Sequence, residues 1–212
     1  MSRPSKNTDQ RLIQAAQELL PKVGCSGLNL RDVARKARVN LGMFHYHFGS
    51  KDEFTRAVLQ QTYELFFKEF NLAVEQENEN PRRALEAALF AFARFVRDNR
   101  QLIVALLRDV LNGNKIVLQF VQENIGRHVG VILDLIQKAH PELRFTTQAA
   151  LVFLLSTVNV PILVTELVRL TGSKRVFGLT SSEFSEIIAS DEALRNRIGL
   201  AVDGLTGERI LA

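Results

Sequence analysis

Apolar side chains recur every three or four residues along almost the whole chain, and this spacing predicts an all-α protein. The pattern is interrupted where Asn, Gly, Pro or short polar runs occur, and no strand-like alternation stands out. The expected helices cover residues 8–23, 52–74, 81–98, 101–111, 115–139, 146–170 and 191–205, with a short one over 182–188.

Two further helices, both short, are predicted between Asn29 and Phe48, separated by a three-residue turn. Asn29 and Asn40 stand at their expected starts, and Asn is a favoured N-cap residue. The second helix buries Phe44 and Phe48, which lie one turn apart. Two helices joined in this way form the helix-turn-helix that places its second helix in the major groove of DNA. The first helix has a small apolar face made of Leu30, Val33, Ala34 and Ala37.

The side of the second helix that faces away from Phe44 and Phe48 is expected to face the groove. At 100° per residue, Tyr46 points directly away from these two rings. We expect Tyr46 and His47 to hydrogen-bond to a phosphate or a base edge. The groove-facing residues as a set are Gly42, Met43, His45, Tyr46 and His47.

The second helix has no Arg, Lys, Gln or Asp from residue 41 to residue 48, which restricts how it reads bases. The commonest bidentate contacts to guanine and adenine therefore cannot come from its middle. We expect Leu41 and Met43 to touch thymine methyl groups, and Asn40 or Arg31 to supply the polar base contact. Asn29, beside Arg31, is counted with the DNA-binding residues.

Basic charge is concentrated at the N-terminal end of the chain. The first 56 residues hold ten Lys or Arg against five Asp or Glu, whereas the remaining residues hold 17 against 18. Ser50–Glu53 has the form of a capping box, so Lys51 begins a third helix and is expected to be free to meet a phosphate. Arg3 and Lys6 on an N-terminal arm, together with Arg31 and Lys51, are candidate phosphate contacts. The alternative is an ordinary solvated basic face.

Together these residues resemble the TetR family of bacterial transcriptional regulators. The resemblance implies an N-terminal three-helix helix-turn-helix domain over residues 1–56, followed by an all-helical effector-binding and dimerisation domain over residues 57–212. Arg38 departs from the family pattern, which usually has Gly in the turn, so a left-handed backbone there would be strained. His45 stands where Tyr is usual and can still donate a hydrogen bond. The matching stretches are Gly24, 29–34, 39–48 and 50–54.

The segment 145–165 carries no charge and is long enough to span a bilayer. Polar residues and a proline interrupt it, which favours a buried or subunit-contacting helix over a membrane span. Because this helix is apolar on more than one face, we expect it to pair with its own copy and with the 191–205 helix in an intersubunit four-helix bundle. The family resemblance implies the same homodimer, with recognition helices roughly 34–36 Å apart on a near-palindromic double-stranded operator.

Phenylalanines gather on the helices after residue 56 and are expected to surround a cavity for a small hydrophobic effector. For each candidate the alternative is an ordinary core or solvent-facing side chain. The family resemblance implies a repressor that the effector releases from its operator, with the helix that begins after Ser50 as the lever. The candidate effector-binding residues are Phe66, Phe70, Phe92, Phe95, Phe120, His128, Phe153 and Asn159, and Glu166 is a further polar candidate.

Signatures of catalysis are missing from the sequence, which has no Gly-rich phosphate loop, HExxH pair or nucleophile elbow. His45 and His47 lie about 200° apart around a helix and cannot readily share a metal, so neither a metal nor a cofactor is expected. The single Cys25 and the absence of a signal-like start favour the cytoplasm. An all-helical enzyme and a basic membrane-surface protein are the competing classes, and sequence-selective DNA binding would separate a regulator from both.

Overall fold

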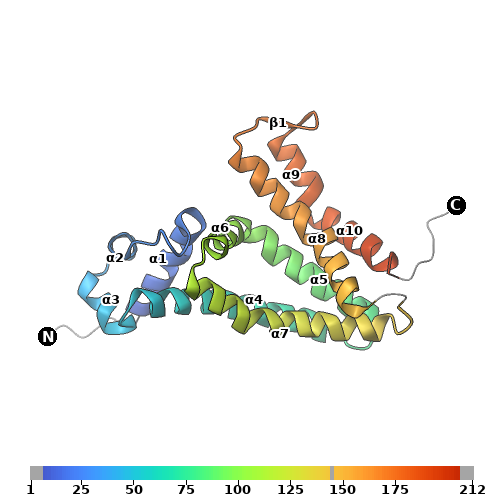
Figure 1. Ribbon diagram of the computed structural model, residues 1–212, viewed down its shortest axis with the longest axis horizontal. Coiled ribbons are helices and arrows are strands. Elements are labelled where there is room, and N and C mark those ends of the chain that lie inside the picture. The colour runs from blue at the N-terminus through green and yellow to red at the C-terminus, as the bar shows by residue number, and fades with distance from the viewer. Residues whose placement is uncertain (1–6, 144–145, 206–212) are drawn as a thin grey trace. The chain divides into compact units, whose positions relative to one another are not determined.

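The computed structural model describes residues 7–143 and 146–205 of the chain, and these residues form ten α-helices and one small hairpin (Figure 1). The all-α prediction is therefore confirmed, and each helix expected from the apolar pattern ends within two residues of its predicted bounds. The helices are α1 Thr8–Val23, α2 Leu30–Ala37, α3 Leu41–Phe48, α4 Lys51–Glu75, α5 Pro81–Asp98, α6 Arg100–Leu111, α7 Lys115–Ala139, α8 Thr147–Leu170, α9 Ser181–Ala189 and α10 Asp191–Asp203.

Helix α5 shows why the bounds could be predicted. Oδ1 of Asn80 caps its start by accepting a hydrogen bond from the Arg83 backbone N–H at 3.1 Å. Pro81 occupies the first helical position, where its missing N–H costs nothing. Asn99 follows the last helical residue. Both ends of α5 are therefore determined by residues at or next to the helix termini.

The hairpin between α8 and α9 was not predicted. It joins β1 Arg175–Val176 to β2 Leu179–Thr180 in antiparallel register. The two connecting residues have positive φ, 51° at Phe177 and 83° at Gly178, as a tight two-residue hairpin turn requires. Strands of two residues are too short to produce an alternating pattern, so this segment read as a break between helices.

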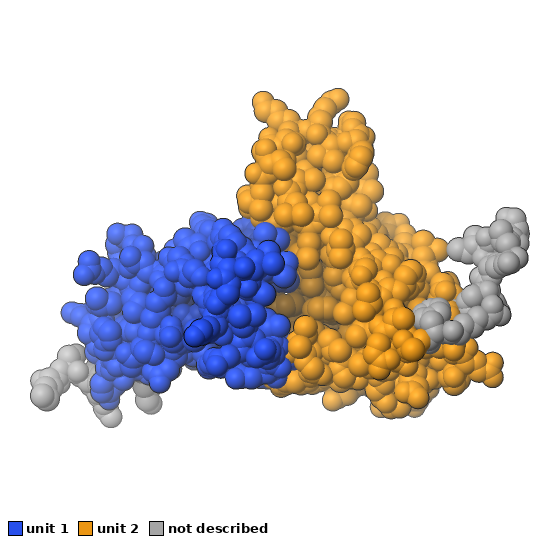
Figure 2. All heavy atoms as spheres, in the orientation of Figure 1, with its two compact units in different colours: residues 1–65, 101–124 blue, residues 66–100, 125–212 orange. Residues whose placement is uncertain are grey.

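The chain divides into two compact units, which Figure 2 distinguishes by colour. Unit 1 comprises Met1–Leu65 and Gln101–Asn124, and unit 2 comprises Phe66–Arg100 and Ile125–Ala212. Helices α4 and α7 each contribute residues to both units. The boundary after residue 56 concerns a division of function and stays a prediction.

In unit 1, α1 packs against α2 and α3. The buried face of α1 is formed by Leu12, Ala16 and Leu20, which follow one another at intervals of four residues. Val23, the last residue of α1, is 38% exposed.

In unit 2, α5, α8 and α10 pack against one another, and α9 packs on α8. Among the described helices, α8 is the one whose length and composition would allow a membrane span. The buried core helix of a soluble protein passes the same test, and α8 also buries Asn159, Thr165 and Glu166. The core of the unit includes Leu85, Leu89, Leu154, Ile162, Leu194 and Ile198.

Candidate functional site

Side-chain caps fix the start of α2 and of α3, the two helices of the predicted helix-turn-helix, which we call the reader. Oδ1 of Asn29 accepts a hydrogen bond from the Arg31 backbone N–H at 2.9 Å, and Oδ1 of Asn40 accepts one from the Gly42 N–H at 2.8 Å. Both helices therefore begin where the sequence predicted. Because each cap uses the amide oxygen, the amide NH2 group is the part of Asn29 or Asn40 that remains to donate to a base.

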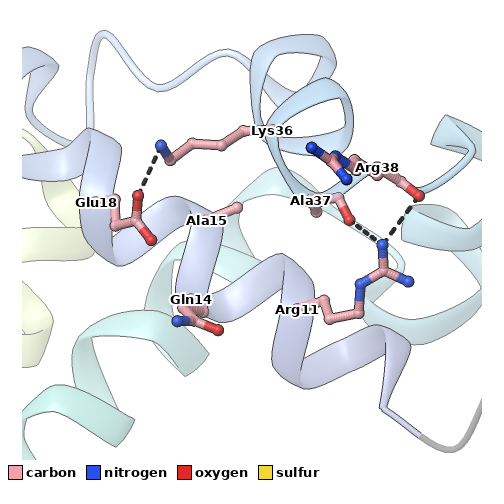
Figure 3. Close-up of a pocket in the computed structure, with 7 residues that line it drawn as sticks. All are labelled: Arg11, Gln14, Ala15, Glu18, Lys36, Ala37 and Arg38. Atoms are coloured by element: carbon pink, nitrogen blue, oxygen red, sulfur yellow. Dashed lines mark hydrogen bonds and ion pairs between the residues drawn. The ribbon is translucent and has the colours of Figure 1, made fainter.

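Arg38 in the turn adopts the left-handed conformation, with φ 54° and ψ 45°. A residue with a Cβ atom costs roughly 1 kcal/mol in this conformation. The turn is held from α1, because Nη2 of Arg11 donates to the carbonyl oxygens of Ala37 at 2.5 Å and of Arg38 at 3.2 Å (Figure 3). A departure from the family's usual Gly is thus accommodated by a side chain 27 residues away.

A second link joins α1 to α2 beside this turn. Nζ of Lys36 lies 2.6 Å from a carboxylate oxygen of Glu18, and both residues line the pocket drawn in Figure 3. Arg38 lines the same pocket. The C-terminal end of α2 is therefore anchored to α1 through both of these links.

Helix α3 has one buried face and one exposed face, as its periodicity predicted. Phe44 is fully buried, with its ring centroid 5.0 Å from that of Phe54 in an edge-to-face contact. Tyr46 is 73% exposed. Phe48 is only half-buried, although its ring lies 4.8 Å from Phe54. The side of α3 opposite Phe44 is therefore free for a partner.

The remaining candidates on α3 differ in accessibility. Gly42 and His45 are exposed, whereas Leu41 and Met43 are half-buried. Nδ1 of His45 lies 3.3 Å from the carbonyl oxygen of Gly49. His47 is half-buried, and its Nε2 is buried without a hydrogen-bond partner among the described residues. Nε2 of His47 is therefore not presented at the surface in this arrangement.

The capping box at the start of α4 is present. Glu53 accepts a hydrogen bond from the Ser50 N–H at 3.1 Å, and Oγ of Ser50 accepts one from the Glu53 N–H at 3.2 Å. Lys51 is less free than expected, because its Nζ donates to the carbonyl oxygen of Ser26 at 3.3 Å. An ammonium group has three donors, so this bond leaves two for a phosphate. The bond also ties α4 to the loop between α1 and α2.

Asp109 on α6 supports the same loop and was missed by sequence reasoning. Its side chain is 1% exposed, and Oδ2 accepts a hydrogen bond from the Cys25 backbone N–H at 2.6 Å. A Cβ atom on Gly24, which has φ +70°, would lie 2.8 Å from the same oxygen. Asn114 adds a bond from Nδ2 to Oγ of Ser26 at 3.0 Å. The only signal in the sequence was a charge on the apolar face of α6, seven residues after Leu102.

Cys25 is buried, and burial raises the pKa of its thiol to about 12, with the Asp109 charge acting in the same direction. A thiol with so high a pKa has little thiolate at neutral pH and reacts slowly with oxidants. The structure thus favours a packing role for Cys25 over a redox switch.

Five of the candidate effector-binding residues form one aromatic cluster in unit 2. Phe66 stacks on Phe95 with ring centroids 4.4 Å apart, and the His128 ring lies 4.8 Å from Phe92. Phe70 is 6.3 Å from His128. Burial lowers the pKa of His128 to about 4, so its imidazole is neutral at physiological pH.

The other candidates lie elsewhere. Phe120 belongs to unit 1, where its ring is 6.1 Å from Tyr63. Phe153 is 43% exposed on α8. Asn159 is buried with both amide atoms lacking a hydrogen-bond partner among the described residues. Glu166 is buried and bonds with Arg169 through two contacts of 2.5 and 2.8 Å.

Two of the candidate phosphate contacts, Arg3 and Lys6, lie outside the described residues. Within the described ranges, no three His, Cys, Asp or Glu side chains come together in a group that could hold a metal ion.

Comparison with known proteins agrees with the helix-turn-helix geometry. Residues 12–58 match the family model described as bacterial regulatory proteins, tetR family. An HTH-type transcriptional repressor of Mycobacterium tuberculosis is 40% identical over 48 residues, which are 23% of this chain and 26% of that protein. A regulator of Lactococcus lactis, from the 3′ region of lacX, is 26% identical over 84 residues, which are 40% of this chain and 43% of that protein. The chain therefore matches less than half the length of either relative.

The fold extends the similarity over the whole chain. A TetR-like transcriptional regulator from Rhodococcus sp. RHA1 superposes with a TM-score of 0.69 at 19% identity, covering 98% of this chain and 100% of that one. These proteins are named as transcriptional regulators, which is the class expected from the sequence. Residues 12–58 thus match the tetR family model, and the arrangement of the helices is that of the TetR-like regulator from Rhodococcus sp. RHA1.

Proposed function

We propose that the protein is a cytoplasmic, homodimeric regulator that reads a near-palindromic operator with α3 and leaves it when a small effector binds. The observation that carries the DNA-reading part is the two-faced α3, in which Tyr46 is 73% exposed while Phe44 is fully buried. A helix held rigidly by its inner face, with its outer face free, is the geometry needed for insertion into the major groove.

The proposed contacts follow from the accessible groups. Leu41 and Met43 meet thymine methyl groups, and Tyr46 meets a phosphate or a base edge. Asn40 uses its amide NH2 group toward a base, because its oxygen caps α3. His47 would have to rotate to offer its Nε2. The phosphate contacts and remaining positions proposed for the interface are Arg3, Lys6, Asn29, Arg31, Gly42, His45 and Lys51.

Two alanine variants test DNA reading. Tyr46→Ala should weaken operator binding about tenfold and leave the free energy of unfolding unchanged, because the side chain is mostly exposed. Lys51→Ala should weaken binding to all sequences alike and lower the slope of log K against log salt by about one. Fluorescence anisotropy with selected and scrambled duplexes measures both effects.

Phe177→Ala is the matched control, since it removes a ring that is 90% exposed in unit 2. DNA binding that stays equally strong in the Tyr46→Ala, Lys51→Ala double variant would refute the proposed interface. Salt-sensitive binding without sequence preference would instead support a general DNA or membrane-surface binder.

The homodimer proposal rests on an apolar stripe along α8. Unit 2 leaves Val152, Val160 and Leu167 more than half exposed on this helix, at spacings of eight and seven residues that place them on one face. Leu200 of α10 is 63% exposed. Contiguous apolar surface of this kind marks an interaction site, and pairing with a second copy would bury α8 and α10 in a four-helix bundle.

Val160→Asp should turn a dimer into a monomer at micromolar concentration, because the change buries a charge in the centre of the proposed stripe. Sedimentation equilibrium measures the shift. Leu107→Asp, which changes another exposed apolar residue, in unit 1, is expected to remain dimeric. A parent protein that is monomeric at this concentration would rule the dimer out.

The effector proposal rests on the aromatic cluster and on the continuity of α4. This helix begins at Lys51, beside the DNA reader, and runs without a break to Phe66 and Phe70 in the cluster. A hydrophobic effector received among these rings would change the position of α4 and thereby the reader. By reciprocity, operator DNA must weaken effector binding by the same factor. Calorimetry that finds equal effector affinity with and without operator would exclude this coupling.

A further inference from the structure

A groove on unit 2 runs beside α5, between the last turns of α4 and helix α10. Its larger part has a volume of about 410 Å³, within the range of small-molecule sites. A second hollow of about 370 Å³ shares Glu77, Ala87, Phe90 and Arg195 with it, so Phe90 stands between the two. Small side chains make room for the groove, and these are Ala73, Ala87 and Ala91.

Arginines surround Phe90 without carboxylate partners. The guanidinium carbon of Arg195 lies 3.9 Å from the centre of the Phe90 ring, and that of Arg94 lies 6.0 Å from it. Neither these two residues nor Arg83, which lines the smaller hollow, forms an ion pair with another described residue. Two guanidinium groups beside one ring repel each other unless an anion lies between them.

The nearby carboxylates of the described chain form no ion pair with Arg94 or Arg195. Asp98, which lines the groove, bonds at 2.8 Å with Arg97, a residue outside its lining. The pKa of Asp191 is lowered, first by its hydrogen bond from Arg97 and also by the charges of Arg94 and Arg195. Asp191 is therefore close enough to feel the charges of Arg94 and Arg195, but its hydrogen bond comes from Arg97.

The α4 side of the groove has the opposite charge. Glu69, on α4, and Glu77, just after it, line the groove, and neither forms an ion pair with a described residue. A ligand with one negative end would satisfy the arginines, whereas a second negative group would be repelled by these glutamates. A single negative charge on an otherwise apolar molecule therefore suits this lining better than two negative charges would.

We propose that this groove binds an amphipathic organic monocarboxylate, with its carboxylate between Arg94 and Arg195 and its apolar body against Phe90 and the neighbouring alanines. Guanidinium groups bind carboxylates through paired, charge-assisted hydrogen bonds. The site is distinct from the aromatic cluster but touches it, because Phe95 lines the groove and stacks on Phe66 of α4. Any regulatory effect of the ligand rests on the proposed function, whereas its binding does not.

Calorimetric titration of the full chain with naphthoate tests the proposal, with the neutral isostere naphthylmethanol as a reference ligand. Naphthoate should bind at least ten times more tightly than the alcohol. Arg94→Gln and Arg195→Gln should each weaken naphthoate binding at least tenfold. Arg175→Gln is the matched control, because it removes the same charge from the exposed hairpin and should leave binding unchanged.

Ala91→Leu provides a second variant that keeps every charge but fills the groove, and it should also weaken naphthoate binding at least tenfold. The proposal is overturned if the parent binds no naphthoate, if acid and alcohol bind equally, or if the groove variants bind like the parent. Circular dichroism establishes that each variant is folded.

A separate operator titration without naphthoate keeps the two proposals apart. Naphthoate binding that depends on the arginines, in a chain without operator selectivity, would support the groove and refute the regulator. Operator selectivity in a chain that binds no naphthoate would support the regulator and refute the groove proposal.

Discussion

Phe44→Ala is expected to lower the free energy of unfolding by about 3–5 kcal/mol, the usual cost of removing a fully buried phenylalanine ring. Phe44 has no exposed surface, and its ring contacts those of Phe54 at 5.0 Å and Phe48 at 5.8 Å between centroids. These contacts hold α3 to the start of α4. Because α3 has only eight residues, it is too short to persist as a helix without this packing.

The expected functional result of Phe44→Ala is therefore loss of operator binding, although the residue faces away from the proposed DNA surface. Urea denaturation followed by circular dichroism measures the stability, and anisotropy measures the binding. Phe48→Ala is the informative comparison. Because the Phe48 ring is only half-buried, its removal should lower the free energy of unfolding clearly less than Phe44→Ala does. A Phe44→Ala protein with parental stability would show that the ring is not part of the reader's core.

The elements of this fold could be predicted because their causes are local. Asn29, Asn40 and Asn80 each cap a helix through a bond to a backbone N–H two or three residues later. The opposite orientations of Phe44 and Tyr46 follow from helical geometry alone. Neither kind of feature requires knowledge of a distant part of the chain.

The features that sequence reasoning missed depend on distant contacts. Asp109 accepts a hydrogen bond from the Cys25 backbone, 84 residues earlier in the chain. Arg11 donates a hydrogen bond to the carbonyl oxygen of Arg38, 27 residues later. The accessibility of Nε2 on His47 depends on how the ring is rotated, which periodicity does not determine. The groove beside α5 exists because small residues from two elements and an arginine from a third meet there.

The aromatic residues illustrate the same limit. Phe66, Phe92 and Phe95 were expected to surround a cavity because they lie on the helices after residue 56, but only packing decides whether such rings surround a cavity or fill it. In unit 2 the rings pack on one another, with centroids 4.4 Å apart for Phe66 and Phe95 and 5.7 Å apart for Phe66 and Phe92. An effector entering the cluster would have to separate these rings, whereas the adjacent groove is already open.

The buried histidine in this cluster leads to a prediction about pH. Burial lowers the pKa of His128 from 6.5 to about 4, because the charged imidazolium is poorly solvated among aromatic rings. In the unfolded chain the same group titrates near 6.5. Between these two values the unfolded state binds more protons, so lowering the pH favours unfolding. The stabilisation is complete above pH 6.5 and is lost as the pH falls toward 4.

Between pH 7 and pH 5 the His128 contribution to the free energy of unfolding should fall by about 2 kcal/mol. Urea denaturation of the parent and of His128→Phe at the two pH values isolates this contribution, since the variant retains a ring but no titrating nitrogen. His140 is the necessary control, because burial and the Arg82 charge also lower its pKa, while Asp203 opposes them. In His140→Gln the free energy of unfolding should still fall between pH 7 and pH 5 by the amount attributed to His128. If His128→Phe loses as much stability on acidification as the parent, the imidazole is already hydrated in the folded state and the aromatic cluster is open to water.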